Sequence, residues 1–533
     1  MKPGHPSSLT TSPASKTLAA AGGTLASRFL GLARDMLVAW VLGAGADIFI
    51  VAFRIPNIVR RIAAEGSLGL AYATTLGRLM PTSLFAGEAI RVCRRTSLAF
   101  AALGLGLALV LALWPMGTIA LVAPGLLGRE SLPVAVLCLL LSLPFLPMAG
   151  FGAVLSATLV AGGKMAQAAM APLFLNAGIL VFGLVALLAI TPLPQAAWFA
   201  LGVSAGGILQ CLWLLWHCRV MARQAAHRKG AEPPKTCSQA SVGGILRQTP
   251  TALFTSCGTQ LHFVIAAAAA SFLQEGSIAA LYFAERLVEF PLMLAGAVPA
   301  MVMAPDFARQ QGQTLANSLA ATLRLGLFCS IPAAIGLFFL ATPLVMLFFG
   351  HGAFSAEKTA ASGQVLACMA LSLPFICMVR PLAAAIAALP ATEEQGSKAQ
   401  KMATKATLWS LLATGLTCAT LTPLLGLVGT GLALNTGAVV QAILLYRILA
   451  MAGVAETLPA LGNAILPVIF GALVLGIGLA LLPDLASETT SAWWLAGCIG
   501  GISLVAGFGW IAVYTLLGNA EAVALWAAFR DQA

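Results

Sequence analysis

The sequence predicts an all-α membrane protein that crosses the bilayer many times, and three observations support this prediction. Only 9% of the 533 residues are charged, whereas about 25% is usual in soluble proteins. Hydrophobic residues make up 60% of the chain, and the mean hydropathy is +0.95. Apolar runs recur from one end to the other, and many are long enough, at about 18 residues or more, to cross a hydrocarbon core of about 30 Å as a helix. These numbers exclude a soluble domain as the main part of the chain.

The apolar runs predict about fourteen transmembrane helices. The second run has the weakest signal, because it contains Pro56 and a group of charges. In chain order the predicted ranges are 16–42, 47–80, 92–122, 131–161, 167–190, 195–221, 245–273, 276–306, 315–349, 358–390, 403–421, 425–451, 460–482 and 491–517.

The longest polar connection divides the first twelve predicted helices into two groups of six. We therefore expect an N-terminal six-helix lobe in residues 1–222, a cytoplasmic loop in 223–244, a C-terminal six-helix lobe in 245–452, and two additional helices with a short tail in 453–533. Two similar six-helix lobes around a central cavity are a known plan of transporters, with the substrate site near the middle of the membrane.

The lysines and arginines of the connections predict the orientation, since these residues accumulate in cytoplasmic loops. If the N-terminus is inside, the outer connections hold little beyond Arg129 and Lys358, whereas the inner ones hold thirteen basic residues from Arg91 to Arg447. Both termini are thus expected in the cytoplasm. The net charge of +11 then reflects membrane topology and buried arginines, so no nucleic-acid partner is expected.

Ionisable residues also lie inside the predicted helices, where they are costly and usually face a cavity or a partner. They concentrate in the first, second and eighth helices. These residues are Arg28, Arg34 and Asp35; Asp47, Arg54, Arg60, Arg61 and Glu65; and Glu285, Arg286 and Glu289.

Structural roles remain open for some of these charges. Arg61 and Glu65 have the i, i+4 spacing of an ordinary ion pair on a helix surface. Arg54 could extend from a helix end to the membrane surface, and Asp47 suits the N-terminus of the second helix.

Arg28 and Arg34 point to a different role. They lie six residues apart, with Gly31 between them as a place for a bend or for close packing of a neighbouring helix. Arginine offers a planar fork of donors that matches phosphate, and it does not lose its proton when buried. Several intramembrane arginines, with carboxylates to orient them, predict a site for an anion, and pyrophosphate is a good candidate.

No enzymatic or metal-binding signature competes with this interpretation. The stretch "AGGKMAQ" lacks the first glycine and the Ser/Thr of a phosphate-binding loop, no HExxH occurs, and the eleven cysteines form no CxxC pair. His262 alone inside an apolar run is expected to be a packed or hydrogen-bonded side chain. We expect no enzyme activity, no metal and no cofactor, so the energy for transport would come from a gradient, a membrane potential or an imbalance of substrate.

Several stretches resemble the MurJ/MviN lipid II flippase family, within the multidrug/oligosaccharidyl-lipid/polysaccharide exporter superfamily. The most specific are "SRFLGLARDMLVAWVLGAG" and "FIVAFRIPNIVRRIAAEGSL". The others are "GGILQ" at 206–210, "ASFLQEGSIAALYFAERLVEFP" at 270–291 and, more weakly, "LFFGHGAFS" at 347–355.

The resemblance implies that the chain moves lipid II, the undecaprenyl-pyrophosphate-linked peptidoglycan precursor, from the inner to the outer leaflet of the bacterial cytoplasmic membrane by alternating access. Lipid II and membrane lipids would be its partners, with cell-wall synthesis or division proteins as further candidates. It also implies that Arg28, Arg34, Arg60 and Arg286 bind the pyrophosphate, with Asp35, Glu65, Glu285 and Glu289 as acids of the same cavity. The seventh, eleventh and twelfth helices have no carboxylate, so the sodium site of some family members is not expected.

Three other functions remain as alternatives. The first keeps the fold but changes the cargo to another undecaprenyl-linked saccharide, such as an O-antigen or capsule unit. The second is a membrane glycosyltransferase or polymerase, which the absence of a sizeable outer loop disfavours. The third is an exporter of organic cations, which an arginine-rich cavity would repel.

Overall fold

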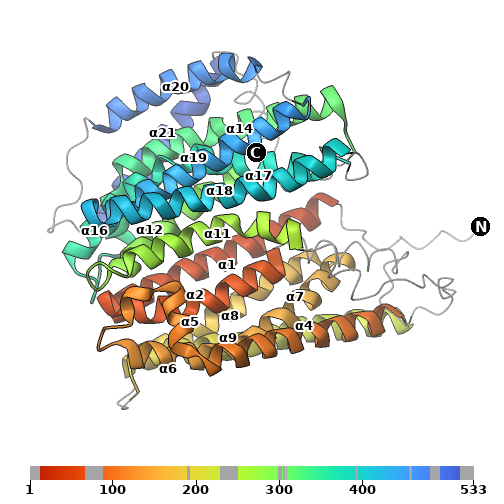
Figure 1. Cartoon of the computed structure of the whole chain (residues 1–533), viewed down its shortest axis with the longest axis vertical. Coiled ribbons are helices and arrows are strands. Elements are labelled where there is room, and N and C mark those ends of the chain that lie inside the picture. The colour runs from red at the N-terminus through yellow and green to blue at the C-terminus, as the bar shows by residue number, and fades with distance from the viewer. Residues whose placement is uncertain are drawn as a thin grey trace, which may run out of the picture. The chain divides into compact units, whose positions relative to one another are not determined.

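The computed structural model describes residues 13–65, 88–188, 193–227, 250–297, 303, 306–307, 309–390, 394–454, 459–480 and 492–516. For some residues near helix ends, including Glu65, it describes only the backbone. Every regular element in these ranges is a helix (Figure 1). The predicted all-α class is therefore confirmed.

The helices follow the apolar runs of the sequence. In chain order they are α1 (Pro13–Leu42), α2 (Ala46–Glu65), α4 (Glu88–Leu113), α5 (Pro115–Val122), α6 (Leu132–Ser142), α7 (Phe145–Ala161), α8 (Met165–Leu188), α9 (Gln195–His227), α11 (Pro250–Ala270), α12 (Ser277–Leu292), α14 (Gly312–Phe339), α15 (Ala341–Phe349), α16 (Ala356–Ala370), α17 (Leu373–Ala388), α18 (Glu394–Leu425), α19 (Leu427–Met451), α20 (Pro459–Ala480) and α21 (Ala492–Leu516). Short 3-10 turns lie at Gly43–Gly45 and Pro124–Leu126, and a π-helical turn at Met293–Ala297.

Within the described ranges, nine helices are long and apolar enough to cross a membrane, or ten if α16 and α17, which meet at a bend of 50°, form one span. Each of the fourteen predicted ranges overlaps one helix or a broken pair. The chain is thus a multi-pass membrane protein, while the number fourteen stays a prediction. The part of the second predicted range beyond Glu65 lies outside the described residues.

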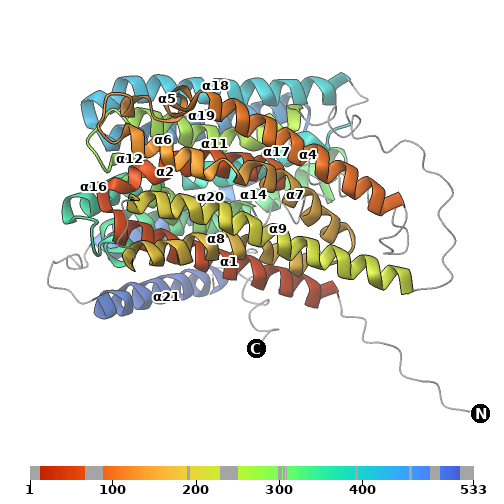
Figure 2. The same cartoon turned by 90° about the horizontal axis from the view of Figure 1, so that it is seen from below.

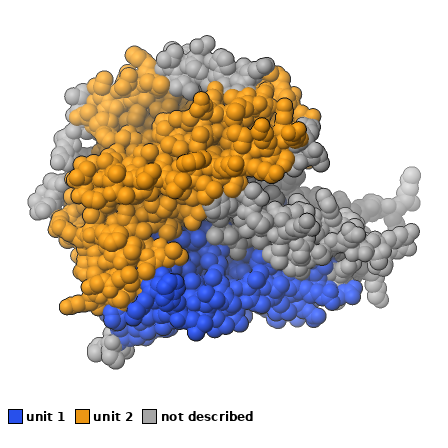
Figure 3. Space-filling model, viewed as in Figure 1, with its two compact units in different colours: residues 1–38, 51–118, 133–253 blue, residues 39–50, 119–132, 254–533 orange. Residues whose placement is uncertain are grey.

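The chain divides into two compact units, which Figure 3 shows in different colours. Unit 1 comprises Met1–Val38, Val51–Thr118 and Pro133–Leu253, and unit 2 comprises Ala39–Ile50, Ile119–Leu132 and Phe254–Ala533. Two short segments from the first part of the chain therefore belong to unit 2.

Both units contain the same pattern of helix pairs. In unit 1, α4 packs on α7, α8 on α9 and α7 on α9. In unit 2, α14 packs on α16 and α17, α18 on α19 and α17 on α19. The α18–α19 pair runs side by side in both views (Figure 1, Figure 2). The expected division into two six-helix lobes stays a prediction.

A short internal repeat marks corresponding breaks in the two units. The residues "LSLPF" occur at 141–145, between α6 and α7, and again at 371–375, between α16 and α17. Proline has no amide proton to donate, so a helix tends to break at such a position. At both breaks the serine hydroxyl donates to the carbonyl three residues earlier, Ser142 to Leu139 at 2.9 Å and Ser372 to Met369 at 2.6 Å. The same sequence thus forms the same local structure twice.

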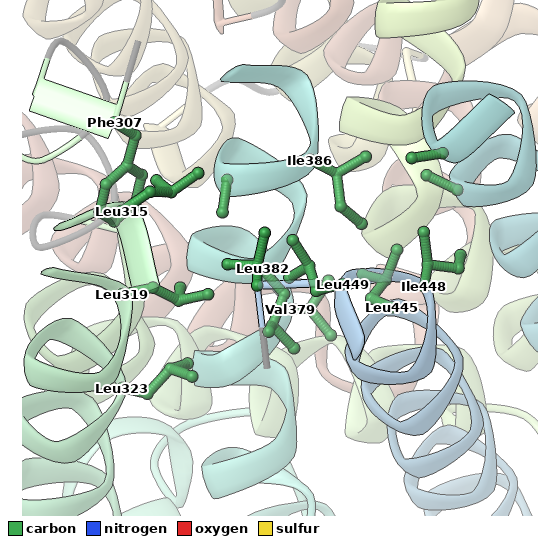
Figure 4. Packing of buried hydrophobic residues seen from close by; sticks show 14 of the residues in the cluster. Phe307, Leu315, Leu319, Leu323, Val379, Leu382, Ile386, Leu445, Ile448 and Leu449 are labelled. Carbon is green, nitrogen blue, oxygen red and sulfur yellow. The ribbon is translucent and has the colours of Figure 1, made fainter. Parts of the chain in front are cut away.

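Figure 4 shows an apolar cluster in unit 2, where α14, α17 and α19 meet. Leu319, Leu382 and Leu449 point toward one another from the three helices, and each is at most 1% exposed. Because lipid is as apolar as leucine, such packing stabilises a membrane protein mainly through van der Waals contact.

Gly352 allows a close contact inside unit 2, which leads to a prediction. Its φ is +67°, and a Cβ there would collide with the indole and carbonyl of Trp40. The next residue, Ala353, donates its N–H to the Trp40 carbonyl at 2.9 Å. Gly352→Ala is expected to lower the thermal unfolding temperature of the purified protein in detergent. Gly453→Ala is the control, because Gly453 has a φ of +75° but open space around its Cβ position; equal losses in the two variants would contradict the collision.

Candidate functional site

Arg34 and Asp35 form a buried ion pair in unit 1. Both Nε and Nη2 of Arg34 donate to Oδ1 of Asp35, at 2.9 and 2.6 Å. The two residues are only 6% and 2% exposed. The guanidinium also lies over the ring of Phe53, with 5.2 Å from its central carbon to the ring centroid. The carboxylate and the ring together fix the plane of the guanidinium.

Asn176 of α8 completes the environment of Arg34. Its Oδ1 accepts from Nη1 of Arg34 at 2.9 Å, and its Nδ2 donates to the carbonyl of Ser27 at 3.0 Å. A Cβ on Gly31 would lie 3.3 Å from this amide. Gly31 thus permits close packing of α8, one of the two roles expected for it. The sequence interpretation missed Asn176; a single amide within a long apolar run was the signal that could have revealed it.

The other candidate arginines of unit 1 lie on α1 and α2. Arg28 of α1 is half-buried, and Arg54 of α2 is 8% exposed. Arg60, also half-buried, donates from Nη2 to Oδ1 of Asn57 at 3.1 Å, one turn earlier in α2. Arg61 is half-buried, but the proposed Arg61–Glu65 pair depends on a side chain outside the described part of the chain.

Arg286 is held by its own helix in unit 2. Nη1 donates to Oε2 of Glu289 at 2.8 Å, and Nη2 donates to Oε1 of Glu285 at 3.3 Å. The guanidinium lies over the ring of Tyr282, with 4.6 Å from its central carbon to the centroid. The side chains of Glu285 and Arg286 are 3% and 13% exposed. Two carboxylates and one aromatic ring therefore orient this arginine.

Asp47 has a different environment from the other acids. It lies in the first turn of α2, as expected, but its carboxylate accepts hydrogen bonds at the N-terminus of α12. Oδ2 accepts from the N–H of Gly276 at 2.8 Å, and Oδ1 accepts from the N–H of Ala279 at 2.7 Å. Asp47 is 4% exposed. The residue before α12 is Gly276, with φ +85°, which has no side chain to cap the helix. Asp47 supplies this cap from α2.

The contact between Asp47 and α12 belongs to a larger set of bonds within unit 2, which we name the interlock. It joins residues 39–50, 119–132, 270–279 and 350–358. Gly125 donates its N–H to Oγ of Ser271 at 2.9 Å, and Arg129 donates from Nη2 to the carbonyls of Ser271, at 2.9 Å, and Leu273. The hydrogen bond from Ala353 to the carbonyl of Trp40 also belongs to the interlock.

The charges are distributed unequally between the two groups of candidates. Within unit 1, the sequence of α1 and α2 has six basic residues, Lys16 and five arginines, and two acids, Asp35 and Glu65, an excess of 6 − 2 = 4 positive charges. In α12, Arg286 is opposed by Glu285 and Glu289, which gives 1 − 2 = −1. Basic residues therefore outnumber acids on these two helices of unit 1, whereas two carboxylates of its own helix oppose the charge of Arg286.

Among the residues that the structure describes, no group of three or more His, Cys, Asp and Glu side chains is arranged to hold a metal ion. The nine described cysteines are not in disulfides. The candidate residues are instead arginines with oriented forks, a geometry suited to phosphate and carboxylate groups.

The fold and the buried arginines define a polytopic membrane transporter. A solved structure described as "Lipid II flippase MurJ, inward closed conformation" matches with a TM-score of 0.72 and 19% identity, over 93% of this chain and 98% of that one. An inward-facing multidrug MATE transporter matches with a TM-score of 0.59 and 14% identity, over 83% of this chain and 99% of that one. At these identities the two structures show the fold alone.

The sequence comparisons give the family. The model of the family described as lipid II flippase MurJ matches residues 38–496. The lipid II flippase MurJ of Burkholderia cenocepacia is 28% identical over 468 residues, 86% of this chain and 88% of the relative. The probable lipid II flippase MurJ of Vibrio cholerae is 30% identical over 380 residues, 68% and 70% of the two chains. The chain belongs to the MurJ family.

Proposed function

We propose that the chain is a flippase that moves lipid II from the inner to the outer leaflet of the bacterial cytoplasmic membrane. The observation that carries the proposal is the excess of four positive charges in the sequence of α1 and α2 within unit 1. Such charges are stable within a membrane only if they face a cavity, a partner or an anion. The pyrophosphate of lipid II supplies that anion, and membership of the MurJ family supports this cargo.

In this proposal Arg28, Arg34, Arg60 and Arg286 bind the pyrophosphate in a central cationic cavity. Arg34 is oriented in advance, because Asp35 and Asn176 hold its fork. A donor that is already oriented loses less conformational entropy on binding than a mobile side chain does. Asp35 thus acts as a positioning residue and does not touch the substrate.

Arg286 gives the site a means of release. Glu285 and Glu289 bond the two terminal nitrogens of its guanidinium. We propose that the pyrophosphate takes the place of Glu289, the more exposed acid, at Nη1. When the cargo leaves, the carboxylate returns and the charge of Arg286 is again compensated. The exchange keeps the arginine paired at both stages, so neither stage leaves a buried charge alone.

Transport would proceed by alternating access, with both termini in the cytoplasm. The interlock would then lie toward the outer face, because it follows the C-terminus of α1. We propose that its bonds, including those of Asp47, form in one state and break in the other. A negative-inside potential favours outward movement of an anion by about 2.3 kcal/mol per charge per 100 mV. The chain would perform no covalent chemistry, and cell-wall synthesis or division proteins remain candidate partners.

Complementation of a bacterium depleted of its own lipid II flippase tests this function. The wild-type gene is expected to restore growth, whereas Arg28→Ala and Arg286→Ala are expected to fail at equal membrane expression. Arg94→Ala is the control, because Arg94 is an exposed residue of α4. Rescue by both cavity variants would show that the arginines are structural. Failure of the well-expressed wild type would favour another undecaprenyl-linked saccharide as the cargo.

A further inference from the structure

A second polar cluster lies inside unit 2 and takes no part in the anion site. It consists of His262 on α11, Ser410 and Thr414 on α18, and Gln441 on α19, which are 6%, 0%, 0% and 3% exposed. A Cβ on Gly437 of α19 would collide with the Thr414 hydroxyl and the His262 ring. The three helices thus meet closely around one imidazole.

Both nitrogens of the imidazole face hydroxyl groups. Nδ1 of His262 lies 2.7 Å from Oγ1 of Thr414, and Nε2 lies 3.2 Å from Oγ of Ser410. Each hydroxyl also reaches a carbonyl of its own helix: Ser410 reaches that of Thr407 at 2.8 Å, and Thr414 reaches that of Ser410 at 3.1 Å. His262 is therefore hydrogen bonded, as its sequence context predicted.

These distances allow the ring to be satisfied with either one or two protons. When both hydroxyls donate their protons to the helix carbonyls, their oxygens can each accept a hydrogen bond from the ring. An imidazolium has two N–H groups and donates one to each hydroxyl oxygen. When the ring is neutral, one hydroxyl turns and donates to the bare nitrogen. The carbonyl that it leaves can keep its bond within the helix. Rotation of one hydroxyl is thus the only local change that the loss of a proton requires.

A cavity gives water a place beside the ring. His262, Gln441 and Ser372 line a small cavity of about 20 Å³ together with apolar side chains of α11, α16, α17 and α19. This space is enough for about one water molecule. Ser372 belongs to the break between α16 and α17, where the two helices meet at 50°. The cavity therefore connects the imidazole with the bend between α16 and α17.

No charged side chain lines this cavity among the described residues. The titratable groups on the helices around it, apart from His262, do not contact the imidazole. They are Glu357, Lys358 and Cys368 on α16; Cys377 and Arg380 on α17; Glu394, Lys398, Lys401, Lys405 and Cys418 on α18; and Tyr446 and Arg447 on α19. An imidazolium at this place would be a buried cation without a carboxylate, so it would favour a conformation in which the cavity holds more water.

We propose that His262 is a proton-binding site whose occupancy is coupled to the conformation of unit 2. The proton passes from a hydronium ion that reaches the cavity to the bare ring nitrogen, which leaves a water molecule behind and changes the ring from neutral to +1. The reverse step returns the proton to water as hydronium. The site would give the transporter a proton as coupling ion. That last role rests on the proposed flippase function, whereas proton binding itself does not.

Solid-state NMR of the full-length protein in lipid, labelled with 15N-histidine, tests proton binding without any cargo. Neutral imidazole and imidazolium have different nitrogen shifts, so a titration from about pH 5 to about pH 8 covers the range in which histidine usually changes charge. We expect a titrating signal that is lost in His262→Gln and retained in His217→Gln. His217 is the control because it is half-buried and its Nδ1 contacts the carbonyl of Trp213. A His262 signal that stays neutral over the whole range would overturn the proposal.

Coupling is tested by lipid II transport in proteoliposomes with an imposed pH gradient. The wild type is expected to respond to the gradient, and His262→Gln is expected to lose that response while its transport under an imposed membrane potential continues. An equal response of both proteins would refute the coupling. If the wild type moves no lipid II but His262 titrates, the proposed cargo is wrong and the proton site stands. If lipid II moves but His262 stays neutral, the proton site is wrong and the proposed cargo stands.

Discussion

Asp47→Ala is expected to abolish complementation and to lower the thermal unfolding temperature of the protein more than any other single change considered. The substitution removes the acceptor of two buried backbone N–H groups, those of Gly276 and Ala279. Each buried donor left without an acceptor costs about 1–3 kcal/mol. The loss of a negative charge at the N-terminus of α12 adds to this cost.

Asp47→Asn distinguishes the contribution of the hydrogen bonds to stability from that of the negative charge. An amide keeps one oxygen as acceptor and presents its NH₂ group to the other backbone donor, so an intermediate loss is expected. Glu357→Ala is the matched control, because Glu357 lies in the first turn of α16 but is exposed, and Ser355 already caps that helix. Unfolding temperatures of Asp47→Ala and wild type that agree within error would contradict the role of Asp47 as a cap for α12.

Arg34→Ala is expected to have the second largest effect, and for a different reason. It removes the guanidinium that donates two hydrogen bonds to the carboxylate of Asp35, which is 2% exposed. Breaking a buried pair from one side costs about 3–5 kcal/mol, because the remaining charge stays in a medium of low dielectric constant. We expect less folded protein in the membrane and a lower unfolding temperature in detergent.

The double variant Arg34→Met/Asp35→Leu distinguishes stability from function. Apolar residues of similar volume often replace a buried pair without loss of stability. The double variant is therefore expected to unfold at a higher temperature than Arg34→Ala and yet to fail in complementation, because it has no guanidinium to bind pyrophosphate. A double variant that restores growth would show that Arg34 is needed only for folding.

The positions of the helices could be predicted from the sequence because hydropathy reports the length of each apolar run. It does not report where a helix continues beyond the membrane. For this reason α18 begins at Glu394, nine residues before the predicted range, and α9 extends to His227, beyond the predicted end at 221. The breaks within α6–α7 and α16–α17 were also missed, because the sequence remains apolar on both sides of Pro144 and Pro374.

The candidate arginines could be recognised as unusual residues, but their partners could not. The partners of Asp47 lie 229 and 232 residues further along the chain, and those of Arg34 include an amide on α8, 142 residues away. Contacts at such separations leave no pattern in a local window. By contrast, the Arg286–Glu289 contact joins residues three apart on one helix, and spacing alone indicates it.

Equilibrium binding of lipid II to the purified protein shows whether the arginines bind its pyrophosphate. We predict that Arg28→Gln, Arg60→Gln and Arg286→Gln each weaken binding by about tenfold or more, since a hydrogen bond to a charged group contributes about 1.5–3 kcal/mol. Arg94→Gln should bind as the wild type does. Unchanged affinity in all three variants, with folding intact, would show that these arginines do not bind the pyrophosphate.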